Sequence, residues 1–90
     1  MLNIERRKQP KKYMAKTDGN TRKKLDKMIA DIQNQTQDCG TVIKRLTDSV
    51  YFKASREHYR IIFTIENETA IIEEVNTRGN IDYRRYTVGK

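Results

Sequence analysis

The sequence has 90 residues, of which 36% are hydrophobic and 34% are charged. This length supports one small domain, residues 1–90, and excludes a second domain or a deep cofactor cleft, so we expect any function to lie on the surface. No apolar run is long enough to span a membrane and no secretion signal follows the first residues, so we expect a cytoplasmic protein without a membrane partner.

Positive charge is concentrated at the beginning of the chain. Residues 1–27 contain ten Lys or Arg against three Asp or Glu, whereas nine basic and nine acidic residues follow. Clustered cations attract phosphate through their field and through counterion release, so the asymmetry predicts a nucleic-acid or acidic partner. A basic face that is merely solvated is the alternative.

With one cysteine, Cys39, and one histidine, His58, the chain has neither an internal disulfide nor a set of zinc ligands, and we expect no metal or cofactor.

A short strand and two helices are predicted for the first part of the chain. Residues 2–5 alternate apolar and polar side chains, as in a strand. A brief helix then begins at Gln9-Pro10 and ends at residues 18–20, where Asn20 or Thr21 caps a longer helix. The longer helix has an apolar stripe with helical spacing, which we expect to lie on the core: Leu25, Met28, Ile29 and Ile32. Lys23 and Lys27 project from its other face.

The second part of the chain predicts an antiparallel meander. Its fold class is therefore α+β, with an N-terminal strand, a helical hairpin and then the meander sheet. Residues 42–46 lead to the sheet with a small apolar cluster of Val42, Ile43 and Leu46. The predicted strands are residues 50–54, 59–66 and 69–75, with turns at 55–58 and 67–68, a loop at 76–82 and a short last segment at 83–88.

Alternate residues of the strand at 59–66 share a face. Tyr59, Ile61, Phe63 and Ile65 form the core face, whereas Arg60, Ile62 and Thr64 lie on an opposite, partly open face. Lys53 from the neighbouring strand and Arg78 from the following loop can converge there on Arg60, as in a phosphate site. Pairing of Arg60 with Glu73 or Glu74 on the next strand is the structural alternative, and spacing alone does not choose between them.

Three motifs resemble the RelE/ParE family of bacterial toxins, and the resemblance covers essentially the whole chain. They are the segment SREHYRIIFTI, the loop NTRG and the closing IDYRRY, which follow the N-terminal strand and the helical pair in that order. The segment 59–63 resembles the family's strand of tyrosine, arginine, two hydrophobic residues and an aromatic residue. Arg78 and Tyr83 resemble its closing arginine and nearby tyrosine.

For the RelE branch, the resemblance implies a metal-independent, ribosome-dependent endoribonuclease that cuts messenger RNA in the ribosomal A site. The ribose 2′-hydroxyl attacks the adjacent phosphate, and preorganised cations stabilise the charge that develops. Lys53 and Arg60 would bind the phosphate, Arg78 would stabilise the transition state near the leaving oxygen, and Tyr83 would contact the RNA or take part in proton transfer. The implied RNA- and ribosome-binding residues are Lys23, Lys24, Lys27, Arg56, Arg84 and Arg85.

Two other functions stay open. A ParE-like toxin would inhibit DNA gyrase through its helical hairpin, and Arg60 would then be structural. A catalytically silent regulator would bind an antitoxin and DNA, and two departures from the ribonuclease pattern, Tyr51 and Glu73, favour it. In each case the resemblance implies a DNA-binding antitoxin whose acidic, amphipathic segment covers the basic surface, with apolar contacts along residues 25–32 or the sheet edge. Its complex with the toxin would bind operator DNA.

Overall fold

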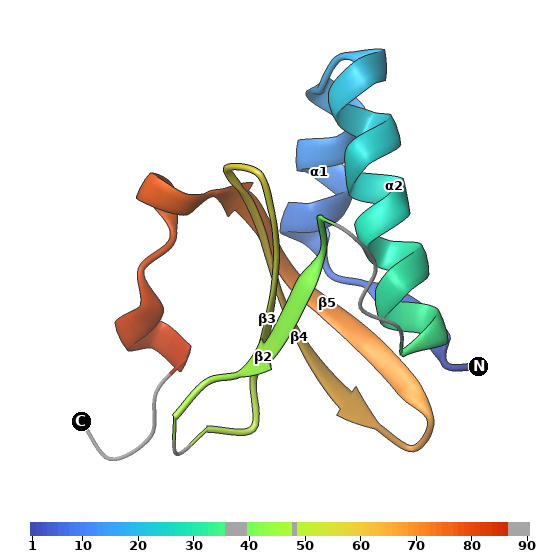
Figure 1. Cartoon of the computed structure of the whole chain (residues 1–90), viewed down its shortest axis with the longest axis vertical. Coiled ribbons are helices and arrows are strands. Elements are labelled where there is room, and N and C mark those ends of the chain that lie inside the picture. The colour runs from blue at the N-terminus through green and yellow to red at the C-terminus, as the bar shows by residue number, and fades with distance from the viewer. Residues whose placement is uncertain (36–39, 48, 87–90) are drawn as a thin grey trace.

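The computed structural model describes residues 1–35, 40–47 and 49–86 (Figure 1). Two helices and a five-stranded sheet form an α+β fold in the predicted order of strand, helical hairpin and antiparallel meander. The predicted fold class is therefore confirmed. Cys39 and the last two residues of the predicted segment 83–88 lie outside the described residues.

The first and last strands of the chain are neighbours in the sheet. Its spatial order is β1 (Asn3–Arg6), β5 (Thr69–Thr77), β4 (Tyr59–Glu66), β3 (Phe52–Arg56) and β2 (Val42–Arg45). β1 runs parallel to β5, and every other pair is antiparallel. The meander therefore ends beside the N-terminal strand, which becomes one edge of the sheet, and β2 becomes the other.

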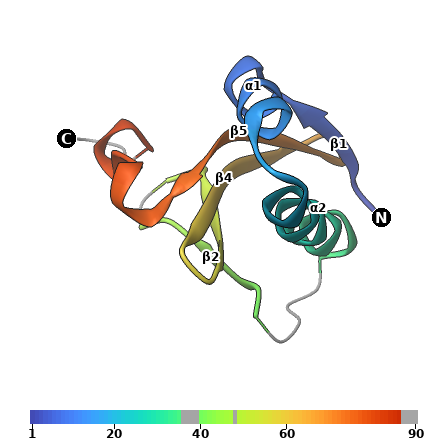
Figure 2. The ribbon, with the colours of Figure 1, turned by 90° about the horizontal axis from the view of Figure 1, so that it is seen from above.

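Both helices cover the same face of the sheet (Figures 1 and 2). α1 (Lys8–Lys16) packs on β5, and α2 (Gly19–Asn34) packs on β3. The prediction that Asn20 or Thr21 caps α2 was wrong, because the Asp18 carboxylate accepts from the Thr21 amide at 3.0 Å and α2 already begins at Gly19. No helix in the described ranges is long and apolar enough to cross a bilayer.

The main core lies between the helices and the sheet. The predicted stripe of α2 is buried there, with Leu25 and Met28 fully inaccessible. Ile61 and Phe63 of β4 contribute from the sheet, as predicted, and Tyr59 packs against this core partly buried, whereas Ile65 is 39% exposed. The other buried members of this core are Leu2, Met14, Ala54, Ala70, Ile72 and Val75.

A smaller core lies on the opposite face of the sheet. Ile62 of β4 is fully buried there against Ile81 and Tyr86, and three partly buried side chains surround them: Leu46, Tyr51 and Tyr83. The polypeptide after β5 forms two short 3₁₀ helices, η1 (Arg78–Asn80) and η2 (Tyr83–Tyr86), which lie on this side of the sheet (Figure 1). The face that was predicted to be partly open is therefore covered at Ile62.

Several strands differ from their predicted bounds. β1 spans Asn3–Arg6 rather than residues 2–5, and β5 continues to Thr77, two residues into the predicted loop. β3 ends at Arg56, two residues into the predicted turn at 55–58. β3 begins at Phe52 rather than at residue 50 because Tyr51 belongs to a loop, in which its carbonyl accepts from the Leu46 amide at 2.9 Å. Residues 42–45 form the edge strand β2. Their predicted apolar cluster was wrong: Val42 is 45% exposed, Ile43 packs on the main core, and Leu46 packs on the smaller one.

The β4–β5 hairpin supplies a test of backbone strain. Its turn residues Asn67 and Glu68 have φ values of 51° and 62°, the left-handed conformation in which a Cβ atom is unfavourable. Glu68→Gly should therefore raise the free energy of unfolding by about 0.5–1 kcal/mol in urea denaturation. The matched variant Glu66→Gly, which falls within β4, should lower it. Destabilisation by Glu68→Gly would contradict the turn geometry.

Candidate active site

Strand register places the predicted phosphate-binding side chains of β3 and β4 on one face. Lys53 is the cross-strand partner of Ile62, and Arg60 is the partner of Ser55 on β3 and of Asn76 on β5. Cross-strand partners share a face, as do residues two apart along a strand. Lys53 and Arg60 therefore lie on the face of Ile62, away from the helices.

The C-terminal segment brings Tyr83 to Lys53. η2 lies over this face because Tyr86 and Ile81 pack on Ile62. The Lys53 ammonium nitrogen then lies 5.5 Å from the centre of the Tyr83 ring, within cation–π range. A predicted cation and the predicted tyrosine, 30 positions apart in the sequence, are thus in contact.

Arg60 and Arg78 lie at the end of the sheet where the β3–β4 turn is. Arg60 NH1 donates to the main-chain carbonyls of Glu57 at 2.8 Å and Tyr59 at 2.7 Å. The Arg78 amide donates to the His58 carbonyl at 2.8 Å, and its side chain is exposed. Among the described residues, no hydrogen bond, ion pair or ring contact joins these two arginines to Lys53 and Tyr83.

Neither predicted carboxylate partner of Arg60 binds it in the described structure. Glu73 lies 3.7 Å from Arg7. Glu74 is 7% exposed, and its carboxylate accepts from the Tyr86 hydroxyl and from the Asn76 side-chain amide, the latter at 3.3 Å. Arg60 is therefore not neutralised by either glutamate.

Glu74 and Tyr86 form a buried polar pair that the sequence analysis missed. The Tyr86 hydroxyl donates to Glu74, and the Tyr86 carbonyl accepts from the hydroxyl of the buried Ser49. Tyr51 packs edge-on against Tyr86 with ring centres 4.9 Å apart, so this departure from the ribonuclease pattern has a structural role. The only signal in the sequence is that Glu74 and Asn76 alternate along β5, which places both on one face.

Burial raises the pKa of the Tyr86 phenol above its ordinary value, and the hydrogen bond to Glu74 raises this pKa further. A negatively charged phenolate beside the carboxylate would be repelled, so the neutral phenol remains the donor. The pair therefore stays intact at neutral pH and fixes η2 on the sheet.

The predicted RNA-binding residues of α2 lie on the helical side of the molecule. Lys23 is exposed, whereas Lys24 pairs with Glu57 at 2.8 Å and Lys27 pairs with Asp31 at 3.0 Å. The hydrogen bond to Glu57 raises the pKa of Lys24. Two of these three cations therefore already have an acidic partner.

The remaining predicted RNA-binding residues belong to β3 and η2. Arg56 donates to the Thr41 hydroxyl at 3.0 Å, and Arg84 pairs with Asp82 at 3.0 Å. Arg85 is mostly exposed, 3.9 Å from Glu74. Because α2 and η2 cover opposite faces of the sheet, the six predicted residues do not form one patch.

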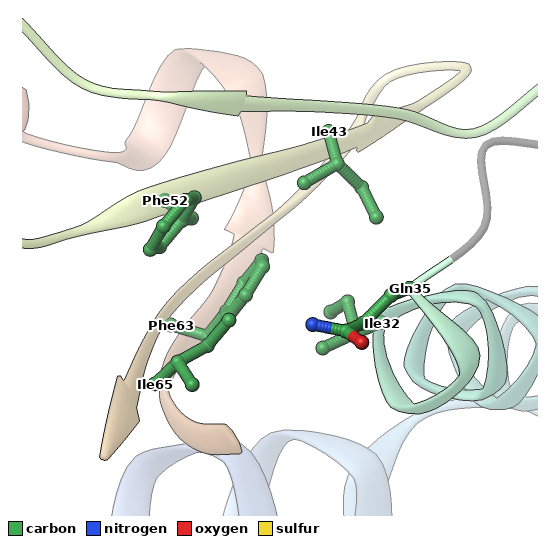
Figure 3. Close-up of a pocket in the computed structure, with 6 residues that line it drawn as sticks. All are labelled: Ile32, Gln35, Ile43, Phe52, Phe63 and Ile65. Carbon is green, nitrogen blue, oxygen red and sulfur yellow. The ribbon is translucent and has the colours of Figure 1, made fainter. Parts of the chain in front are cut away.

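An apolar pocket lies on the helical side, between the end of α2 and strands β2, β3 and β4 (Figure 3). Its volume is about 160 Å³, and Phe52 and Phe63 stack in its wall with ring centres 5.3 Å apart. The other lining residues are Ile32, Gln35, Ile43 and Ile65. This lining has no charged group for a phosphate, so the pocket is separate from the site of Lys53 and Tyr83.

Among the described residues, no group of His, Asp and Glu side chains could hold a metal ion. The sequence matches no protein-family model, and searches of curated proteins and of solved structures found no match.

Removal of the Tyr86 hydroxyl should destabilise the fold. In Tyr86→Phe the ring still packs on Ile62, but the buried Glu74 carboxylate loses a donor, so the free energy of unfolding should fall by about 1–3 kcal/mol. Tyr83→Phe is the matched control, because no hydrogen bond of its hydroxyl is found among the described residues. Equal stability of the two variants in chemical denaturation would show that the pair contributes nothing.

Alkaline pH should weaken the same interaction. The pKa of Tyr86 is higher in the folded than in the unfolded chain, so its stabilising contribution is complete below the ordinary value of 10.0 and is lost as pH rises through the folded-state pKa. Between about pH 9 and pH 11, the free energy of unfolding should fall more steeply for the wild type than for Tyr86→Phe. Parallel curves would contradict this assignment.

Proposed function

We propose that this protein is the toxin of a toxin–antitoxin system and cleaves messenger RNA in the ribosomal A site by attack of the ribose 2′-hydroxyl on the adjacent phosphate. The observation that carries the proposal is the contact of Lys53 with Tyr83 on the face that also holds Arg60. A cation beside an aromatic ring suits RNA, because phosphate and base then have separate partners.

In this reaction Lys53 and Arg60 bind and polarise the scissile phosphate. A guanidinium has five N–H donors, and Arg60 uses only NH1 for the turn carbonyls, so donors remain for phosphate oxygens. Those carbonyls also orient the guanidinium before RNA arrives, which reduces the reorganisation required in the transition state.

Arg78 and Tyr83 act on either side of this phosphate. Arg78 is exposed at the end of β5 and stabilises charge near the leaving oxygen. The Tyr83 ring stacks on a base, or its hydroxyl takes part in proton transfer, while Tyr86 and Glu74 hold η2 in position.

Of the two apolar surfaces expected to contact an antitoxin, the sheet edge is the one that the fold leaves accessible. The apolar stripe of α2 at residues 25–32 is buried against the sheet, so these side chains do not offer a surface to a partner. The pocket beside β2, with the partly exposed Ile65 in its lining, is an available apolar surface at the sheet edge. An acidic, amphipathic antitoxin segment would place an apolar side chain there.

Primer extension on programmed ribosomes tests the proposal. Wild-type protein should produce discrete A-site cuts, and Arg60→Ala or Arg78→Ala should each reduce the cleavage rate by about 100-fold or more, because each removes a cation from the developing charge. Lys16→Ala, at the exposed end of α1, is a control with the same loss of charge and should cut normally. Denaturation curves for all variants separate lost chemistry from lost folding.

Other results would favour the alternatives. Intact message together with growth arrest would indicate a gyrase-type toxin. Intact message with normal growth would indicate a silent regulator. Cuts that persist in both arginine variants would retain the ribonuclease function but overturn the site.

A further inference from the structure

A second group of cations lies on the helical side of the sheet, remote from η2. There β1, α1 and the beginning of α2 surround an open groove of about 450 Å³. Its lining consists of Arg6, Lys11, Met14, Ala15 and Arg22. All three of its polar side chains are thus positively charged.

Arg22 is held in place by the end of α1. Its Nε and NH2 donate to the Met14 carbonyl at 3.1 Å and 2.9 Å, so one fork of the guanidinium satisfies a carbonyl that the helix leaves without an internal partner. The NH1 donors are not used in this contact and remain for a ligand. The groove therefore contains a preoriented cation.

Arg6 and Lys11 have no acidic partner among the described residues. The nearby carboxylates are used elsewhere: Glu5 and Glu73 lie near Arg7, both at 3.7 Å, and Asp18 caps α2. Arg6 and Lys11 are therefore not paired with a carboxylate among the described residues, and they belong to the part of the sequence that has the large excess of Lys and Arg.

We propose that this groove binds the phosphodiester backbone of a nucleic acid. An acidic protein segment is the competing ligand, but protein interfaces depend on buried apolar anchors, and the apolar lining here is limited to Ala15 and to Met14, which is only 8% exposed. Phosphate backbones are bound mainly by cations and counterion release, which this lining supplies. The inference goes beyond cleavage and does not require it.

The residues that line the groove are not the RNA-binding residues expected from the sequence. Those included Lys24 and Lys27, which pair with Glu57 and Asp31. Lys11 lies on α1 and has no such partner among the described residues. The groove lies on the helical side of the sheet and the site at Lys53 on the other side, so the two would bind phosphates separately.

The test compares two adjacent lysines of α1. Lys11→Gln and Lys12→Gln remove the same charge at almost the same place, but only Lys11 lines the groove. We expect Lys11→Gln to weaken binding of a single-stranded RNA of about 12 nucleotides by about fivefold, and to reduce the slope of log affinity against log salt by about 0.7. Lys12→Gln should change affinity less than about twofold. Fluorescence anisotropy at several salt concentrations measures both quantities.

Arg6→Gln is the second test variant, and its affinity and salt slope should match those of Lys11→Gln.

A DNA strand of the same sequence tests whether the groove distinguishes RNA from DNA. If Lys11→Gln weakens binding of both strands, the groove binds any phosphodiester backbone. If it weakens binding of RNA alone, the groove is specific for RNA. Equal losses in the Lys11 and Lys12 variants would overturn the proposal in favour of a diffuse field. A Lys11-dependent affinity for a poly-glutamate peptide that equals the RNA affinity would overturn it in favour of a protein partner. None of these readouts requires cleavage, so they are independent of the ribosome experiment.

Discussion

The burial of Ile62 by the returning C-terminal segment is the constraint on which the candidate site depends. Ile61, Ile62 and Phe63 are consecutive in β4, so apolar side chains project from both faces and both faces need a cover. The helices cover one face, and Ile81 and Tyr86 cover the other. Because Tyr83 belongs to the same short segment, packing on Ile62 also determines where this ring meets Lys53.

The polar pair under this cover gives the packing its specificity. Apolar contacts are not directional, so Ile62 alone would accept several positions of η2. A buried carboxylate is costly unless donors reach it, and Glu74 obtains the Tyr86 hydroxyl only when η2 has one particular register. Ser49 adds a second constraint through the Tyr86 carbonyl. The geometry of the site is thus determined by residues that have no direct contact with Lys53 among the described interactions.

Local patterns predicted the parts of this fold that local energetics determine. The α2 stripe, the bounds of β4 and the turn at Asn67 follow from helical period, β-forming residues and turn chemistry. The irregular register beside Phe63 was not predictable from alternation: Ile72 and Val75 both enter the main core although three positions separate them, and Glu73 is left outside the pairing. The contact of Ser49 with Tyr86 spans 37 positions, and no sequence period encodes it. Alternation along the strands placed Lys53 and Arg60 on one face of the sheet. It could not predict that Ile81 and Tyr86 cover Ile62 on that face, because this packing joins segments that are distant in the sequence.

The net charge of the second part of the chain does not reveal where that part is locally positive. The residues after Lys27 sum to zero, yet their acidic groups are engaged at particular places: Glu57 with Lys24, Glu74 with Tyr86, and Asp82 with Arg84. No ion pair in the described structure uses Lys53 or Arg60. A formally neutral segment therefore presents a cationic surface beside Tyr83, because these three carboxylates have other partners. The field of a site depends on which charges the fold has already paired.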